Sequence, residues 1–169
     1  MVKVFCRNTG TFREFPEGTT LLDAVNEFNF DKPYPIVAAK VNNVAQGLRF
    51  RLYNNKDIEF LDYRTYSGRS AYCRSLCFLL SKAARDVFPE CRIYMRRPIS
   101  KGYFCSLIKP DGFGTDADDV ARIRKRMREI VKENLPFYRQ EVQADEATSV
   151  FARDGRSDVT KLIGTTRPV

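Results

Sequence analysis

Hydrophobic and polar residues alternate at the start of the chain in a pattern that predicts short strands around one helix. Strand-like runs occupy Val2–Cys6 and Thr11–Phe15, with turn-forming residues between them. Apolar residues then recur at helical spacing over residues 21–28, and we expect Thr19 or Thr20 to cap the start of that helix.

Shorter strand-like runs follow this helix, which Pro33 and Pro35 are expected to end. The expected strands are residues 36–41, 50–52 and 58–60, and the hairpin turn is Asn42-Asn43. A ββαββ order with one packed helix is typical of the β-grasp fold. Residues 1–62 are therefore predicted to form an N-terminal, ubiquitin-like β-grasp domain.

The pattern changes after residue 62, where longer helices replace the short strands. Residues 63–69 are polar and include Gly68, which favours a linker. The expected elements beyond it are a helix from Ser70 to Val87, strands at 92–95 and 103–108, and helices at 116–133 and 143–152, with Thr115 as N-cap of the first of these two. We expect a second, α+β two-layer domain over residues 70–169.

Composition favours a folded protein and excludes a membrane span. Hydrophobic residues make up 43% of the 169 residues, enough for a packed core, and no apolar run is long enough to cross a bilayer. We expect a soluble, cytoplasmic protein without a membrane partner. The cysteines are odd in number and form no C-x-x-C pair, which favours free, buried thiols; they are Cys6, Cys73, Cys77, Cys91 and Cys105.

The chain contains no histidine. This excludes the commonest general base, the Ser-His and Cys-His nucleophile pairs and every zinc site that needs histidine. Neither G-x-x-x-x-G-K-[ST] nor G-x-G-x-x-G occurs. Asp116, Asp118 and Asp119 fall at a helix start, where the helix dipole explains acidic residues without a metal. We expect no catalytic residue and no metal site within residues 1–169.

Basic residues outnumber acidic ones, 29 to 21, and the net charge of +8 favours an anionic partner such as RNA or a nucleotide. One run of basic residues alternates with apolar positions of a helix; it consists of Arg122, Arg124, Lys125, Arg126 and Arg128. Two interpretations stay open for this run: a solvated outer helix face, or an RNA-contact face. We expect no DNA partner.

Two segments of the first domain carry a resemblance to a known family. EFPEGTTLLDAV and AAKVNNVAQGLRFRLYNNKDIEFL resemble a TGS domain, the β-grasp module at the N-terminus of threonyl-tRNA synthetases. The later segments RSLCFLLSKAARDVFPECRIYMRRPISKGYFCSL, DADDVARIRKRMREIVKENLPFYRQEV and QADEATSVFARDGRSDVTKLI resemble the editing domain of the same synthetases, in the same order.

The resemblance places the editing family's His-x-x-x-His pair at Arg74 and Phe78, so both histidines are replaced. The family's later Cys-x-x-x-His pair lies beyond the matched region, and we expect the editing-like domain to be incomplete at its C-terminus. Cys73 and Cys77 have the spacing of two zinc ligands but sit one residue early, and structural packing explains them better. The resemblance therefore implies neither zinc nor deacylase activity.

Other features resemble the N-terminal part of a bacterial nucleoside (uridine) kinase: the Asn-Thr-Gly-Thr opening, the Tyr-Asn-Asn-Lys-Asp hairpin and the Arg-Ser-Leu-Cys-Phe helix. This implies a non-catalytic accessory or regulatory region before a phosphate-loop kinase domain, which would lie beyond residue 169. ATP and Mg²⁺ would belong to that parent enzyme, and its kinase domain would be a partner. The alternatives are an aminoacyl-tRNA editing deacylase or an RNA-binding interaction module.

The replaced histidine positions suggest that the former editing cleft persists as a surface for a ligand or a docking domain. Arg74 supplies a fixed cation suited to phosphate or carboxylate, and Phe78 supplies a stacking face. The predicted cleft residues are Arg74, Phe78, Lys82, Lys101 and Tyr103.

Overall fold

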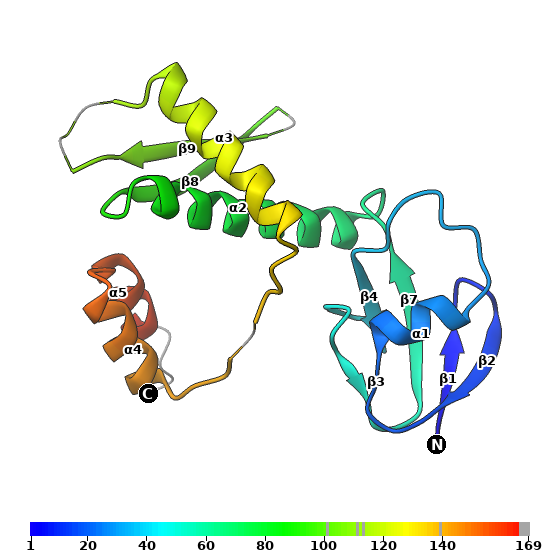
Figure 1. Ribbon diagram of the computed structural model, residues 1–169. Coiled ribbons are helices and arrows are strands. Elements are labelled where there is room, and N and C mark those ends of the chain that lie inside the picture. Colours follow the sequence, from blue (N-terminus) through cyan, green and yellow to red (C-terminus); the bar gives the residue numbers. More distant parts are fainter. Residues whose placement is uncertain (101, 111, 113, 139, 166–169) are drawn as a thin grey trace. The chain divides into compact units, whose positions relative to one another are not determined.

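The computed structural model describes residues 1–100, 102–110, 112, 114–138 and 140–165. By spatial contacts the chain forms two compact units, Met1–Glu133 and Asn134–Val169, which are described separately below (Figure 1). The fold class is α+β, as predicted.

The first part of the larger unit is a mixed five-stranded sheet with the order β2-β1-β7-β4-β5. Strands β1 and β7 run parallel, whereas the other neighbouring pairs run antiparallel. The helix α1 (Leu21–Glu27) lies against this sheet (Figure 1), and the arrangement is the predicted β-grasp. The strands are β1 (Val2–Cys6), β2 (Thr11–Phe15), β4 (Ala38–Val41), β5 (Val44–Gln46) and β7 (Lys56–Leu61), with a separate pair β3 (Thr19–Thr20) and β6 (Arg51–Leu52).

Local signals account for most of these boundaries. The hydroxyl of Thr20 accepts a hydrogen bond from the Asp23 amide at 3.2 Å, which makes Thr20 the N-cap of α1. Asn42 and Asn43 have φ angles of 48° and 69° and form the predicted turn between β4 and β5. The helix ends at Glu27, before the two prolines. The third predicted strand starts at Ala38 rather than at residue 36.

The β-grasp part has a core of its own, because α1 covers the apolar face of the sheet. Its buried members come from all along residues 2–60. They are Val2, Val4, Cys6, Phe15, Leu21, Ala24, Val25, Phe28, Ala39, Val41, Leu52, Ile58 and Phe60.

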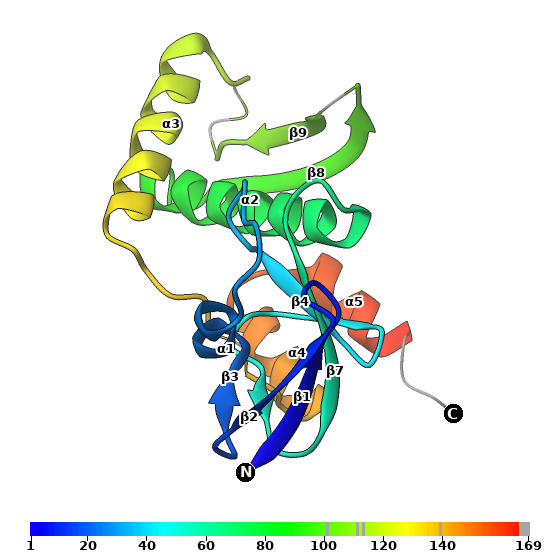
Figure 2. The same ribbon diagram turned by 90° about the vertical axis from the view of Figure 1, so that its right-hand side faces the viewer.

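The second part of this unit packs two helices with a two-stranded hairpin (Figure 2). Its elements are α2 (Tyr66–Val87), β8 (Arg92–Ile99), β9 (Gly102–Ile108) and α3 (Ala117–Lys132). A smaller core joins them, with Ala83, Ala84, Cys91, Ile123 and Ile130 buried and Leu79, Leu80, Val87, Phe88, Ile93, Leu107 and Met127 half-buried around them.

Helix α2 begins at Tyr66, four residues earlier than predicted. The Thr65 hydroxyl caps it by accepting a hydrogen bond from the Gly68 amide at 3.1 Å. The same hydroxyl donates to the Asp62 carbonyl at 3.0 Å, so a tight turn connects β7 to the helix. Most of the predicted linker, residues 63–69, is therefore this turn and the first residues of α2.

The N-cap of α3 is Asp116, and not Thr115 as predicted. Asp116 and Asp119 form a capping box, in which each carboxylate accepts a backbone N–H of the other residue. The Lys109 ammonium contacts the buried Asp119 carboxylate at 2.8 Å. This ion pair joins the start of α3 to the end of the hairpin, and a local capping rule does not include it.

The smaller unit contains α4 (Ala144–Arg153) and α5 (Ser157–Thr165), and neither helix has a fully buried residue. The first corresponds to the predicted helix at 143–152. The second was not predicted, because it is short and begins only two residues after Gly155, whose φ of 67° interrupts the helical pattern. Among the described residues, no helix is long and apolar enough to span a membrane.

The two hydrophobic cores of the larger unit are separated in the sequence by residues 62–69: the first core is formed by residues before this segment and the second by residues after it. The boundary between compact units, however, follows Glu133. The predicted division into a domain at 1–62 and a domain at 70–169 is a different partition of the chain, and it stays a prediction.

Candidate functional site

Three predicted cleft residues share one side of α2. Arg74, Phe78 and Lys82 are spaced by four residues, which places them along one stripe of the helix. All three are exposed, and the Phe78 side chain has 62% of its surface accessible. A phenylalanine at that exposure on a charged helix face provides an accessible ring.

The other side of the predicted cleft is carried by the hairpin. Tyr103 is 51% exposed on β9, two residues before Cys105. Burial raises the pKa of the Cys105 thiol, and the nearby Cys77 of α2 raises it further. Leu80 of α2 and Leu107 of β9 pack around the same small core, so α2 lies close to the hairpin. Lys101 lies outside the described residues.

Two cavities of the larger unit are lined by other described residues, all of them in the β-grasp part. A cavity of about 410 Å³ is lined by residues of β2 and α1, including Arg13, Phe15 and Glu27. A cavity of about 180 Å³ is lined by Lys3, Phe12 and their neighbours in the β-grasp part. The predicted cleft is part of neither cavity, and it stays a prediction.

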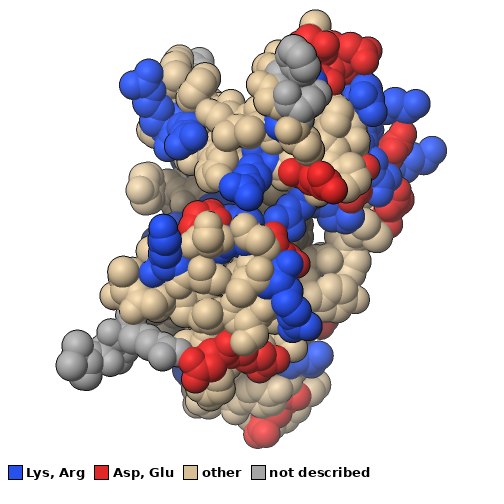
Figure 3. Space-filling model, turned by 90° about the vertical axis from the view of Figure 1, so that its left-hand side faces the viewer, with Lys and Arg blue, Asp and Glu red and all other residues tan. Residues whose placement is uncertain are grey.

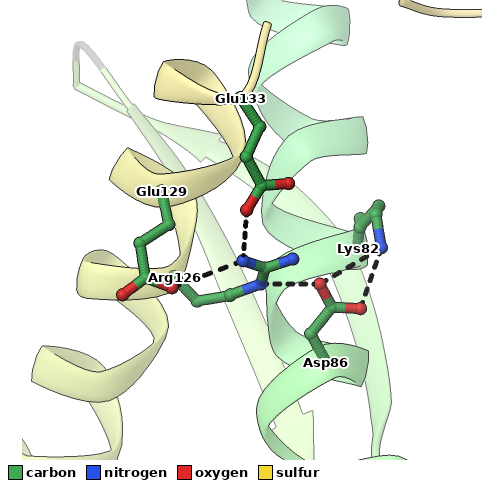
Figure 4. A network of polar contacts seen from close by, with 5 residues as sticks. All are labelled: Lys82, Asp86, Arg126, Glu129 and Glu133. Carbon is green, nitrogen blue, oxygen red and sulfur yellow. Dashed lines mark hydrogen bonds and ion pairs between the residues drawn. The ribbon is translucent and has the colours of Figure 1, made fainter. Parts of the chain in front are cut away.

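Lys82 has an intramolecular partner. Its ammonium contacts both carboxylate oxygens of Asp86, at 2.9 and 3.1 Å, and the Arg126 guanidinium of α3 donates to the same carboxylate at 2.8 Å (Figure 4). The two cations, with Lys82 the stronger influence, hold the pKa of Asp86 below its usual range. Arg126 also contacts Glu129 and Glu133, at 3.3 and 2.8 Å. This network connects α2 to α3.

The basic residues of α3 divide into two groups. Arg126 faces α2 in the network above, and Arg122 stacks over the Phe88 ring with 4.9 Å between its guanidinium carbon and the ring centroid. Arg124, Lys125 and Arg128 are exposed, and none makes a hydrogen bond or ion pair to another described residue. The structure thus separates two packing arginines from three cations that point to solvent.

Lys132 belongs with the exposed cations, although the sequence interpretation did not include it. Arg124, Arg128 and Lys132 are spaced by four residues, and Lys132 is also exposed. Extending the i, i+4 series beyond Arg128 would have found it. The four residues Arg124, Lys125, Arg128 and Lys132 are called the basic stripe below.

Positive charge is divided into separate groups on the face drawn in Figure 3. Uncharged areas and groups of acidic side chains lie between these basic groups. Net charge alone therefore does not define a binding site, and the local arrangement of cations has to do so.

The part of the chain that the structure describes contains no group of three or more Cys, Asp or Glu side chains arranged to hold a metal ion. Asp116 and Asp119 are used in capping α3, and the Lys109 ammonium, by hydrogen bonding, holds the pKa of Asp119 below its usual range. All five cysteines are free, and Cys6 and Cys91 are buried. The expectation that zinc is not bound stays a prediction.

Comparison with known proteins links the chain to aminoacyl-tRNA synthetases. It is 28% identical over 163 residues to the threonine–tRNA ligase of Desulforamulus reducens, which covers 96% of the chain. The threonine–tRNA ligases of Symbiobacterium thermophilum and Bacillus velezensis are 27% and 29% identical, over 91% and 86% of the chain. No protein-family model matches the chain.

The chain spans about a quarter of the length of these relatives, 22–25% in the three cases. The matched segment is their N-terminal region. The predicted resemblance to the N-terminal region of threonyl-tRNA synthetases is therefore supported. These relatives give no support to the resemblance to a nucleoside kinase.

Proposed function

We propose that this chain is an RNA-binding accessory module related to the N-terminal region of threonyl-tRNA synthetases, and that its basic stripe contacts the phosphates of a folded RNA such as tRNA. The observation that carries the proposal is the exposure of Arg124, Lys125 and Arg128 without acidic partners among the described residues. Cations that do not neutralise a carboxylate of their own protein remain available for phosphate.

The proposed interface leaves out Arg122 and Arg126, because each guanidinium group contacts another side chain of the protein. Arg126 is held by three carboxylates and Arg122 covers the Phe88 ring, so both act in packing α3. The packing arginines orient the helix, and the basic stripe then faces outward as a line of charges. Such a line suits a phosphate backbone better than a compact small molecule.

We propose further that the module binds without hydrolysing an ester. The threonine–tRNA ligases act on a tRNA, as their name states, and the resemblance to their editing domain puts Arg74 and Phe78 where that family has two histidines. With no histidine in the chain, the usual base for activating water is missing. Mischarged seryl-tRNA is expected to lose its serine no faster with the protein than without it.

The binding test compares two variants with equal loss of charge. The stripe variant replaces Arg124, Lys125 and Arg128 by Ala; the control replaces Arg49, Arg69 and Lys161, which are also exposed. Binding of tRNA is followed by fluorescence anisotropy over a series of salt concentrations. The stripe variant should bind about tenfold more weakly, with a salt slope smaller by about 2–3 units, because each phosphate contact contributes about one unit.

The control variant should bind nearly as well as the unchanged protein. Equal weakening in both variants would show that only net charge matters and would contradict the proposed interface. Failure of the unchanged protein to bind tRNA at low salt would contradict RNA binding altogether.

From the sequence resemblance alone, which the relatives above do not support, we propose more finely that the module precedes a kinase domain. It predicts a G-x-x-x-x-G-K-[ST] loop in the residues encoded after Val169. A synthetase catalytic core encoded there would contradict the kinase and support an origin in the ligases.

A further inference from the structure

The hairpin of β8 and β9 has two faces of different character. Ile93 pairs with Leu107 across the strands, and both pack into the core with α2 and α3. Because side chains alternate along a strand, the neighbouring pair Tyr94 and Ser106 points to the opposite side. That side, turned away from the helical core, is called the outer face.

A bulge brings an arginine onto the outer face. The register shifts between Met95 and Arg97, which leaves Arg96 as the extra residue. Its guanidinium carbon lies 4.8 Å from the centroid of the Tyr94 ring, and its Nε donates to the Ser106 hydroxyl at 3.4 Å. Arg96 therefore lies across the outer face instead of extending from the sheet edge.

The rest of the outer face combines exposed apolar side chains with exposed arginines. Phe104 is 51% exposed and pairs across the strands with Arg97. Ile108 is 47% exposed and pairs with Arg92. Both arginines are exposed. The strand pair thus presents the half-buried Tyr94 ring and the exposed Phe104 ring among three guanidinium groups.

The charge of the β8–β9 hairpin indicates what kind of partner its outer face would bind. Residues 91–110 contain neither Asp nor Glu, and three of their basic residues, Arg92, Arg96 and Arg97, are exposed on β8. A strand pair that combines aromatic rings with arginines is complementary to a ligand with both flat apolar faces and negative charge. Single-stranded nucleic acid has this combination, since its bases are free to stack, whereas a duplex hides the faces of its bases.

We propose that the outer face of the β8–β9 hairpin binds unpaired bases of single-stranded RNA, with Phe104 as a stacking surface and Arg97 at the adjacent phosphate. The proposal deepens the proposed RNA-binding function and rests on it, but it uses a surface separate from the basic stripe. The stripe would contact the backbone of a folded RNA, and the hairpin would add a preference for an unpaired segment.

The test uses a fluorescein-labelled ten-nucleotide oligouridylate and an RNA duplex of equal length, both measured by anisotropy on the full chain. Phe104→Ala should weaken oligouridylate binding by about tenfold, the loss typical of one stacked base, and leave duplex binding unchanged. Phe104→Tyr keeps a ring and should retain the affinity. Tyr66→Ala is the matched control, because Tyr66 is an aromatic residue that is 90% exposed on α2.

The outcomes separate the two proposals. If Phe104→Ala binds oligouridylate as well as the unchanged protein does, the proposed stacking surface is contradicted. This holds even if the stripe variant binds tRNA more weakly. If the stripe variant keeps its affinity for tRNA but Phe104→Ala binds oligouridylate more weakly, the proposed hairpin surface is supported and the proposed role of the basic stripe is contradicted. If oligouridylate does not bind, and Phe104→Ala instead turns a dimer into a monomer in sedimentation, the face is a protein interface and the proposal is overturned.

Discussion

At the scale of single residues, Gly68 is a position where neighbouring atoms leave no room for a side chain. A Cβ atom there would overlap the carbonyl oxygen of Asp62 and would come within 2.8 Å of the Thr65 hydroxyl. The close approach occurs at the turn from β7 into α2, where Thr65 also caps the helix. Glycine is needed here for space, and not for an unusual backbone angle.

Gly68→Ala is therefore expected to lower the free energy of unfolding by about 1–3 kcal/mol, the range for overpacking a tight site. Chemical denaturation followed by circular dichroism measures the change. Gly47→Ala is the control, because nothing lies within 4 Å of a Cβ at Gly47. Comparable stability of the two variants would show that the turn adjusts freely.

At the scale of elements, the packing of α3 on α2 depends on a charged network as well as on a small core. The Asp86 carboxylate lies between Lys82 of its own helix and Arg126 of α3 (Figure 4). The side chains of Asp86 and Arg126 are each 26% exposed, so solvent weakens the interaction only in part. The network places α3 with its basic stripe outward.

Asp86→Asn should lower the free energy of unfolding by about 1 kcal/mol at pH 7, since it removes the charge that both cations contact. Lys82 and Arg126 hold the pKa of Asp86 below its unfolded value, so folding favours the ionised form. That stabilisation is present above about pH 4 and is lost as the pH falls through the lower, folded pKa.

Thermal unfolding of the unchanged protein and of Asp86→Asn from pH 7 to pH 2 measures this effect. The two melting temperatures should converge as the pH falls below 4. Glu90→Gln, at an exposed residue, is the control and should differ little from the unchanged protein at any pH. A difference that stays constant down to pH 2 would show that the network does not act through the charge of Asp86.

At the scale of the whole molecule, burial is concentrated in the larger unit. Every residue of the two hydrophobic cores lies between Val2 and Ile130. Helices α4 and α5 contribute no fully buried residue. Since apolar burial is the main favourable term in folding, the larger unit holds most of the folding free energy.

A chain of residues 1–133 is therefore expected to fold by itself. Its far-UV circular dichroism should show mixed helix and strand, and it should unfold cooperatively within a few degrees of the full chain. A chain of residues 134–165 should have little stable helix, because short helices without a core are marginal in water. Loss of cooperative unfolding in residues 1–133 would show that the smaller unit is needed for stability.

The sequence alone determined the features that depend on neighbouring residues. Strands β1 and β2 were predicted with their observed bounds, and Thr20 and the Asn42-Asn43 turn act as expected. Alternation, helical periodicity and caps are interactions over a few residues, so they can be recognised in one sequence. The lack of histidine likewise limits the chemistry of these residues before any fold is known.

Only the tertiary structure decided which basic residues are available to a partner. The sequence presents Arg122, Arg124, Lys125, Arg126 and Arg128 as one run. Packing assigns Arg122 to Phe88 and Arg126 to Asp86, 40 residues earlier in the chain. The bulge that lays Arg96 over Tyr94 is similarly set by pairing with β9. These contacts join distant segments, and their geometry exists only once the helices and the hairpin have packed.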